Sequence, residues 1–192
     1  LENQLKGTQK EHYLHDINTL INNSTFTYIR QKEMLGLGNA ILTGEPLIGN
    51  EPFAVILADD LCDNEGDGVL AQLIKIYDKY KCSIVAIEEV AEDQVHNYGI
   101  VSANLIDSSD NIYRVTDMIE KPELKNAPSN LAIIGRYILT PDIFEILSEI
   151  KVDHHKEMQI TDALLEQAKK GKVIAYKFKG KRFDCGSVKG FV

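Results

Sequence analysis

Acidic residues with the chemistry of metal ligands follow an apolar run of the chain. Residues 53–57 are all apolar, and Asp59, Asp60 and Asp63 come directly after them. In open α/β sheets, ligands bind beyond the carboxyl ends of the strands, and a carboxylate there suits a hard cation such as Mg²⁺. Asp59 is therefore a candidate metal ligand. A solvated loop acid or a helix cap is the alternative, and Asp60 and Asp63 compete for the same role.

A second acid lies between an aromatic residue and a glycine. Asp184 follows Phe183 and precedes Cys185 and Gly186, after the basic loop predicted at residues 179–182. An acid at such a strand-to-helix junction is either a ligand or an N-terminal cap, and the pattern alone favours the cap. Cys185 has no Cys or His partner at metal-ligand spacing, so we interpret it as buried and inert.

The tripeptide Glu120-Lys121-Pro122 combines an acid and a base next to a proline. Proline favours an extended backbone at Lys121, so the two charged side chains would point differently while staying near one ligand. A glutamate can accept hydrogen bonds from two sugar hydroxyls, and a lysine can neutralise a phosphate. The alternative, favoured for the tripeptide alone, is the end of an edge strand with solvated charges.

Gln31 precedes two closely spaced glycines, Gly36 and Gly38. Glycine permits close approach of the backbone to a ligand, and a glutamine amide can read a base edge because it both donates and accepts. The spacing matches neither a dinucleotide-binding fingerprint nor a P-loop, so a plain tight turn is the alternative. His154 and His155 lie in a charged stretch without a matching ligand set, which favours a solvated loop.

Hydrophobic periodicity predicts the elements that position these residues. Helices are predicted at residues 10–22, 69–80 and about 159–169, with short helices opening at 36–38 and at Pro141, capped by Thr140. Strands are predicted at residues 25–30, 53–57, 83–87, 99–105, 112–120, 131–139 and 172–178. The strands at 99–105 and 112–120 are expected to form an antiparallel pair, and a further helix is expected to begin at Ser187. The repeated strand–helix–strand order favours an α/β fold with a mostly parallel sheet, as one domain over residues 1–192.

Composition excludes several classes of protein. The formal net charge is −8, which argues against binding to nucleic acid because phosphate backbones need clustered Lys and Arg. The 3 cysteines are scattered, which is inconsistent with a disulfide scaffold and favours a reducing compartment such as the cytoplasm. No apolar run approaches the roughly 20 residues of a membrane span, and no signal peptide is visible. The chain begins with Leu1 rather than Met, so we expect a fragment.

Taken in order along the chain, several short segments together resemble the bacterial UTP–glucose-1-phosphate uridylyltransferase (UDP-glucose pyrophosphorylase) family. They are Arg30-Gln31, Gly36-Leu37-Gly38-Asn39-Ala40, the run from Phe53 to Asp59, Tyr98-Gly99, Glu120-Lys121-Pro122, Ala127-Pro128-Ser129-Asn130-Leu131-Ala132, Gly135-Arg136-Tyr137, Gln159-Ile160-Thr161-Asp162-Ala163 and Asp184-Cys185-Gly186. The resemblance implies a nucleotide-diphospho-sugar transferase fold, which is Rossmann-like: a mixed, mainly parallel sheet flanked by helices. It also implies formation of UDP-glucose and pyrophosphate from UTP and α-D-glucose 1-phosphate, and a homo-oligomer, dimer or tetramer.

The same resemblance implies roles for individual residues. Positions that contact uracil and its ribose are matched by Gln31 and Gly38, and the Mg²⁺ ligands by Asp59 and Asp184, with Asp59 also beside the nucleotide. Positions around the glucosyl group are matched by Gly99, Glu120 and Asn130, and the lysine on the sugar phosphate by Lys121. Lys189 is a further candidate for a phosphate contact.

Two departures from the family pattern stand out. Asn39 occupies a position where the family usually has His, which puts little in doubt. The family's glycine-rich loop, Gly-x-Gly-Thr-Arg with a downstream Lys, has no match in these residues. We therefore expect a partial nucleotidyltransferase domain that is inactive by itself. The alternatives are a dTTP-using sugar-phosphate nucleotidyltransferase and a non-catalytic sugar-nucleotide-binding module.

Overall fold

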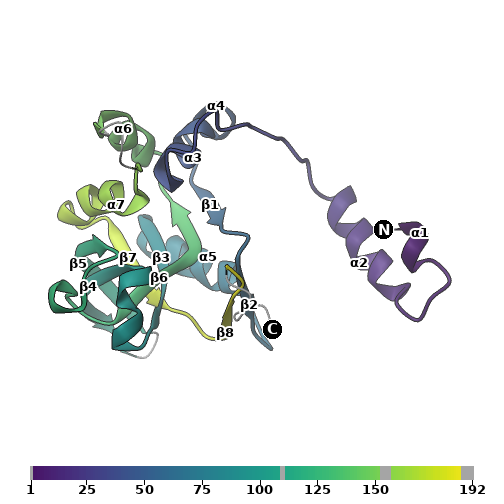
Figure 1. Ribbon diagram of the computed structural model, residues 1–192. Coiled ribbons are helices and arrows are strands. Elements are labelled where there is room, and N and C mark those ends of the chain that lie inside the picture. The colour runs from purple at the N-terminus through teal and green to yellow at the C-terminus, as the bar shows by residue number, and fades with distance from the viewer. Residues whose placement is uncertain (1, 109–110, 152–156, 187–192) are drawn as a thin grey trace. The chain divides into compact units, whose positions relative to one another are not determined.

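The computed structural model describes residues 2–108, 111–151 and 157–186 (Figure 1). The chain divides into two compact units, Leu1–Arg30 and Gln31–Val192, and each is described by itself. The first unit holds α1 (Glu2–Leu5) and α2 (His12–Asn22). The helix predicted at residues 10–22 is confirmed apart from its first two residues. A single domain over residues 1–192 stays a prediction, and the helix expected from Ser187 lies outside the described residues.

The strand predicted at residues 25–30 is wrong. These residues have no regular secondary structure, and the large apolar side chains of Phe26 and Tyr28 are 56% and 90% exposed. Alternating residue types suit a strand, but a strand forms only where a neighbouring strand satisfies its backbone groups.

The second unit contains most of the predicted elements. Its helices are α3 (Leu37–Thr43), α4 (Glu45–Ile48), α5 (Val69–Tyr80), α6 (Asp142–Glu149) and α7 (Ile160–Lys169), with short 3₁₀ helices η1 (Glu92–Asn97) and η2 (Leu124–Asn126). Its strands are β1 (Phe53–Ile56), β2 (Asp60–Asp63), β3 (Ser83–Glu89), β4 (Gly99–Asp107), β5 (Ile112–Glu120), β6 (Leu131–Leu139), β7 (Val173–Lys177) and β8 (Lys181–Asp184). The predicted helix at residues 69–80 and the predicted strands at 112–120 and 131–139 have the bounds of α5, β5 and β6.

Six strands form one mixed sheet in the order β1-β6-β3-β7-β5-β4. Strands β3 and β7 are parallel, whereas the β1–β6, β3–β6, β4–β5, β4–β6 and β5–β7 pairs are antiparallel. The mixed character is therefore confirmed, but a mainly parallel sheet is not, because β6 is antiparallel to all three of its partners, β1, β3 and β4. The predicted antiparallel pair is confirmed as β4–β5, and it extends the main sheet.

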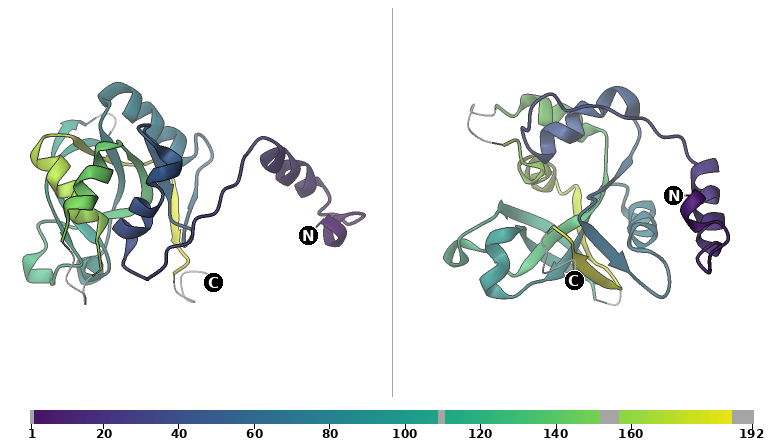
Figure 2. Two further views of the ribbon diagram at one scale, coloured as in Figure 1. Left: turned by 90° about the horizontal axis from the view of Figure 1, so that it is seen from above. Right: turned by 45° about the vertical axis from the view of Figure 1, so that its right-hand side comes forward.

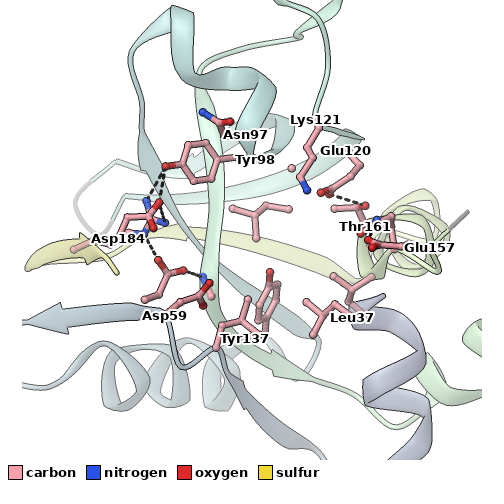
Figure 3. A pocket seen from close by; sticks show the side chains of 18 residues that line it. Leu37, Asp59, Asn97, Tyr98, Glu120, Lys121, Tyr137, Glu157, Thr161 and Asp184 are labelled. Atoms are coloured by element: carbon pink, nitrogen blue, oxygen red, sulfur yellow. Dashed lines mark hydrogen bonds and ion pairs between the residues drawn. The ribbon is translucent and has the colours of Figure 1, made fainter. Parts of the chain in front are cut away.

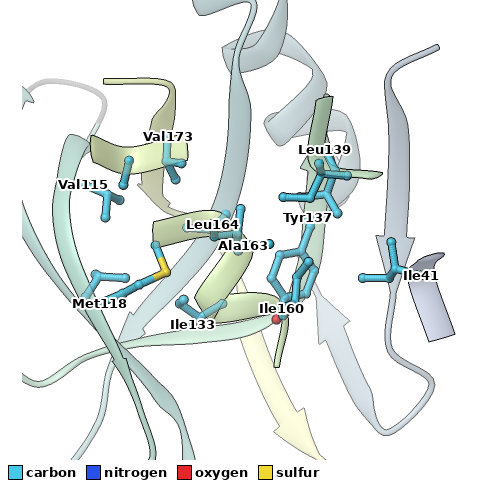
Figure 4. Close-up of a cluster of buried hydrophobic side chains, with 14 of the residues drawn as sticks. Ile41, Val115, Met118, Ile133, Tyr137, Leu139, Ile160, Ala163, Leu164 and Val173 are labelled. Atoms are coloured by element: carbon cyan, nitrogen blue, oxygen red, sulfur yellow. The ribbon is translucent and has the colours of Figure 1, made fainter. Parts of the chain in front are cut away.

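Both faces of the sheet are covered by helices (Figures 1 and 2). Along β3, Ile84 and Ala86 face the cluster that contains residues of α5, while Val85 and Ile87 face the cluster that contains residues of α6 and α7. Figure 4 shows the second of these clusters, with Leu164 of α7 among the strand side chains. Burial on both faces explains why β3 reads as a continuous apolar run.

Strand β1 is not the buried strand of a parallel sheet that its apolar sequence predicts. Its residues alternate between half-buried and exposed, and Ile56 is 56% exposed. In the described part of the chain β1 pairs with β6 alone, so it lies at an edge. An unpaired edge leaves part of an apolar strand in contact with water.

The start of α6 differs from the expected cap. Thr140 makes no side-chain cap of this helix. Its hydroxyl instead lies 3.1 Å from the Ser83 hydroxyl and accepts a hydrogen bond from the Gln167 amide at 3.0 Å. Buried polar groups take such partners when the core would otherwise leave them unsatisfied, so Thr140 joins β3 to α7 rather than capping α6.

A second, two-stranded sheet consists of β2 and β8, which run side by side in Figure 2. The pair is antiparallel and places Asp60 opposite Asp184. Residues 181 and 182 therefore belong to a strand rather than to the predicted basic loop. This small sheet brings together two acidic segments that are far apart in the sequence.

Candidate active site

A pocket of about 340 Å³ opens where the two sheets meet the start of α7. Of the residues that sequence analysis predicts for the site, it is lined by Asp59, Gly99, Glu120, Lys121 and Asp184. Figure 3 shows Asp59, Tyr98 and Asp184 on one side of it and Glu120, Lys121 and Thr161 on the other. The predicted residues Gln31, Gly38 and Asn130 do not line it.

The backbone holds Asp59 and Asp184 beside each other. The Cys185 amide donates to the Asp59 carbonyl at 2.7 Å. A Cβ on Gly186 would lie 3.2 Å from Asp184 Oδ1 and 3.3 Å from Asp59 Oδ2, so both carboxylates converge on this glycine. The Gly186 amide also donates to Asp184 Oδ1 at 3.0 Å, which is the local capping contact that the alternative interpretation expects. The two acids can thus face one ligand.

The structure favours Asp59 over the two competing acids, Asp60 and Asp63. Asp60 is buried, accepts a hydrogen bond from the Gly135 amide at 2.6 Å and pairs with Arg182. Asp63 lies in β2 and is not among the residues that line the pocket. Of the three acids after the first strand, Asp59 and Asp60 both line the pocket with Asp184. Of these two, only Asp59 has no hydrogen-bonded cation among the described residues.

The acid pair fits a cation that is shared with a substrate. Magnesium in phosphate-transfer sites is held by one or two carboxylates together with substrate phosphates. Over residues 2–108, 111–151 and 157–186, no group of three or more His, Cys, Asp or Glu side chains forms a complete protein-made metal site. Two convergent carboxylates at an open pocket match the first arrangement.

Glu120 is fixed by the start of α7. The Thr161 hydroxyl, buried in the first turn of that helix, donates to Glu120 Oε2 at 3.1 Å. Opposite Glu120 in the sheet lies Gly99, where a Cβ would approach Thr161 Cγ2 to 2.8 Å. Glycine at residue 99 therefore allows the close approach that lets Thr161 reach Glu120, and it keeps this wall of the pocket open.

Burial raises the pKa of Glu120, and this effect exceeds the opposing influence of the Thr161 hydrogen bond and of Lys121. The folded state therefore binds a proton at Glu120 more tightly than the unfolded state does. Consequently the free energy of unfolding decreases as pH rises from the ordinary glutamate pKa through the raised one.

We expect Glu120→Gln to remove this loss, because glutamine keeps an acceptor for Thr161 and has no charge to bury. The variant should be more stable than the native chain at neutral pH, and the difference should vanish toward pH 4. Urea unfolding over pH 4–8 measures it. Glu123→Gln, which changes an exposed glutamate paired with Lys125, is the control. Equal pH slopes for Glu120→Gln and the native chain would contradict the interpretation.

Lys121 does not have the extended backbone that Pro122 predicts. Its φ is 45°, in the left-handed region, and its amide donates to the Tyr98 carbonyl at 2.9 Å. Such a conformation costs about 1–3 kcal/mol in a non-glycine residue and persists where the surroundings impose it. The side chain still reaches the pocket, where its ammonium group lies on the same side as Glu120 (Figure 3).

The other predicted residues lie outside the pocket. The Gln31 amide donates to Asn39 Oδ1 at 2.8 Å and to the Gly36 carbonyl at 3.3 Å. Gly38 is packed so closely that a Cβ would lie 2.8 Å from the Met158 carbonyl oxygen. The Asn130 amide donates to the Val90 carbonyl at 3.2 Å. Their roles at a ligand stay predictions.

Three further predictions concern Cys185, Lys189 and the pair of His154 and His155. Cys185 is partly exposed, so the expectation of a buried thiol is wrong. Lys189 lies outside the described residues, as do His154 and His155.

Sequence analysis missed Tyr98, Thr161 and Arg182 as individual site residues. The Tyr98 hydroxyl donates to Asp184 Oδ2 at 3.1 Å, and Arg182 Nη2 donates to the same oxygen at 3.1 Å. Burial alone would lower the pKa of Arg182, but its contacts with Tyr98, Glu88 and Asp60 outweigh this effect and raise the pKa, so the side chain stays charged. For Arg182 the signal in the sequence was its position two residues before Asp184, which places both on one face of a strand. Tyr98 and Thr161 lie in two of the segments that carry the family resemblance.

Residues 4–192 match the family described as nucleotidyl transferase. A UTP–glucose-1-phosphate uridylyltransferase of Pseudomonas aeruginosa is 60% identical over 193 residues, covering 100% of this chain and 68% of that protein. Another from Bacillus subtilis is 42% identical over 192 residues, covering 100% of this chain and 65% of that protein.

Solved structures are similar as well. A UDP-glucose pyrophosphorylase complexed with UDP-glucose is 59% identical with a TM-score of 0.90, covering 95% of this chain and 69% of that one. A UTP-bound enzyme of the same kind from Acinetobacter baumannii is 32% identical with a TM-score of 0.82, covering 99% of this chain and 66% of that one.

Among the described residues, no helix is long and apolar enough to cross a membrane.

Proposed function

The chain belongs to the nucleotidyl transferase family and, within it, to the UTP–glucose-1-phosphate uridylyltransferases, and from this membership we propose how its pocket forms UDP-glucose and pyrophosphate from UTP and α-D-glucose 1-phosphate. The observation that carries the proposal is the arrangement of one pocket, with Asp59 and Asp184 on one side and Glu120 and Lys121 on the other. The ligands of the two solved relatives, UDP-glucose and UTP, have the groups that such a pocket would recognise.

The reaction joins two anions. A phosphate oxygen of glucose 1-phosphate attacks the α-phosphorus of UTP, the new oxygen–phosphorus bond forms, and pyrophosphate leaves with the electrons of the α–β bridge. The attacking oxygen is already ionised at neutral pH, so no general base is required. Catalysis is then mainly positioning and charge neutralisation, and an in-line attack inverts the configuration at phosphorus.

The chain's own residues divide these tasks. We assign Asp59 and Asp184 as the Mg²⁺ ligands, and when bound the ion would neutralise charge on the phosphates. Lys121 orients and neutralises the sugar phosphate. Glu120, held by Thr161, accepts hydrogen bonds from sugar hydroxyls.

Further parts of the proposal rest on the resemblance alone. Gln31 and Gly38 are assigned to the uracil and ribose, and Gly99 and Asn130 to the glucosyl group. A homo-oligomer, either dimer or tetramer, is proposed on the same basis, as is a cytoplasmic location, which also suits three free cysteines. We further propose that these 192 residues by themselves are inactive.

Pyrophosphate release by the full natural chain tests the proposed function. UTP with glucose 1-phosphate is expected to support turnover, and omission of Mg²⁺ should stop it. A preference for dTTP would instead favour a thymidylyltransferase. Binding of UDP-glucose without turnover by either nucleotide would favour a non-catalytic module, although that class has no need for two convergent acids opposite a lysine.

Lys121→Ala is expected to lower kcat by on the order of tenfold to a hundredfold, since a hydrogen bond to a charged group contributes about 1.5–3 kcal/mol. A contact that strengthens as charge moves in the transition state lowers the barrier, whereas a peripheral contact mainly affects binding. Steady-state kinetics of Lys121→Ala, Lys189→Ala and the exposed control Lys125→Ala decide the matter. A larger loss of kcat at Lys189 would reverse the roles.

A further inference from the structure

Arg182 lies at the centre of a cluster of three carboxylates. Its side chain is 7% exposed and contacts Asp60 through Nε at 2.5 Å, Glu88 through Nη1 at 2.7 Å and Asp184 through Nη2 at 3.1 Å. All three nitrogens of the guanidinium group are therefore used, each for a different acid. One positive charge faces three negative charges, which leaves two negative charges in excess.

The cluster also fixes how Asp184 is oriented. Its Oδ2 accepts hydrogen bonds from Arg182 and from the Tyr98 hydroxyl, each at 3.1 Å. The Arg182 guanidinium lies over the Tyr98 ring at 5.1 Å from the ring centre. This cation–π contact holds the two donors next to each other. With Oδ2 held in this way, Oδ1 is the oxygen that lies beside Asp59 near Gly186. Figure 3 shows Tyr98 and Asp184 together at this side of the pocket.

The three acids of the cluster differ in their exposure, and Asp184 is the most exposed of them. The Asp60 side chain is 8% exposed, that of Glu88 28% and that of Asp184 42%. Arg182 thus neutralises charge on the buried side, while the excess negative charge is left where Asp184 meets Asp59. Without Arg182, four carboxylates would repel one another across this region, and Asp60 would be a buried acid without its cation, which is strongly unfavourable.

We infer that Arg182, with Tyr98, is a positioning residue that presets Asp184 for a divalent cation before substrate arrives. This inference rests on the proposed role of Asp184 as a metal ligand. The chemistry requires arginine, because its planar fork presents three nitrogens to three acids at once, whereas a lysine ammonium is a single point charge. Residues that orient metal ligands in this way typically change metal affinity by about 10–100-fold when they are replaced.

The test is Mn²⁺ binding to the full natural chain in the presence of saturating UDP-glucose. The amount of free Mn²⁺, and hence the dissociation constant, is measured from its electron paramagnetic resonance signal. Arg182→Lys is expected to raise the dissociation constant about tenfold or more. Tyr98→Phe, which removes one donor and no charge, should raise it by less. In turnover, Arg182→Lys should need more Mg²⁺ for half-maximal rate and recover most of kcat when Mg²⁺ is saturating. Arg114→Lys is the matched control, because Arg114 contacts the Gly171 carbonyl and no acid of this cluster.

The variant Asp184→Asn distinguishes a failure of the proposed metal site from a failure of the proposed positioning role of Arg182 and Tyr98. If Asp184→Asn weakens Mn²⁺ binding but Arg182→Lys and Tyr98→Phe both leave it within twofold of the native value, the positioning role is overturned and the proposed metal site stands. If Asp184→Asn leaves Mn²⁺ binding unchanged, the proposed metal site fails and the inference fails with it. Should Arg182→Lys not fold, as judged by circular dichroism, Tyr98→Phe decides alone: a raised dissociation constant supports the inference, and an unchanged one overturns it.

Discussion

Replacing either Asp59 or Asp184 by asparagine in the full natural chain is expected to reduce Mg²⁺-dependent turnover by on the order of a thousandfold. The two carboxylates converge on Gly186 from different segments of the chain, and each removal leaves a single carboxylate for a cation that must be shared with phosphates. A metal ion contributes several kcal/mol of charge stabilisation in the transition state, and each 1.4 kcal/mol corresponds to a factor of ten.

The measurement is initial rate against Mg²⁺ concentration for both variants. Asp63→Asn is the matched control, because Asp63 lies in the same strand as Asp60 but not at the pocket, and it should behave like the native chain. Near-normal rates at low Mg²⁺ for either Asp59→Asn or Asp184→Asn would show that this residue is not a ligand.

The elements of the fold that could be predicted from the sequence are those with strong local patterns. Helix α5 and strands β5 and β6 have the predicted bounds because strong periodicity and clear turn residues define them. The direction in which β6 runs was not predictable, since a buried strand has the same apolar pattern in parallel and antiparallel sheets. Residues 25–30 have the pattern of a strand but no partner in the described structure, and partners are not encoded locally.

The site was predictable where a residue type limits the chemistry. An acid after an apolar strand points to a cation, and the structure brings Asp59 and Asp184 to one pocket. The role of Arg182 was not predictable, because its three acids come from β2, β3 and the end of β8 and meet only in the folded chain. The prediction of an extended backbone at Lys121 was wrong for a related reason. The Tyr98 carbonyl that accepts from its amide in the left-handed conformation belongs to another strand connection.

We expect these 192 residues, expressed by themselves, to release no measurable pyrophosphate from UTP and glucose 1-phosphate. The reason is the charge of the pocket. A triphosphate brings several negative charges to a pocket already lined by Asp59, Glu120 and Asp184. Of the two cationic side chains among its described lining residues, Arg182 is committed to three acids and Lys121 is assigned to the sugar phosphate. The described lining residues therefore offer no further cationic side chain to the β- and γ-phosphates.

The main sheet supports the same expectation. Strand β1 leads directly to Asp59, yet in the described structure it pairs with β6 alone and leaves Ile56 56% exposed. An apolar edge strand with unpaired backbone groups favours association with other chains, so we expect these 192 residues by themselves to be prone to aggregation. The 192 residues and the full natural chain should be assayed side by side, with UDP-glucose binding measured by calorimetry as the check that a pocket has formed. Weak binding without turnover is the expected result. Robust turnover by the 192 residues, with no other protein present, would show that Lys121 and the acid pair are sufficient and that the account of triphosphate binding is wrong.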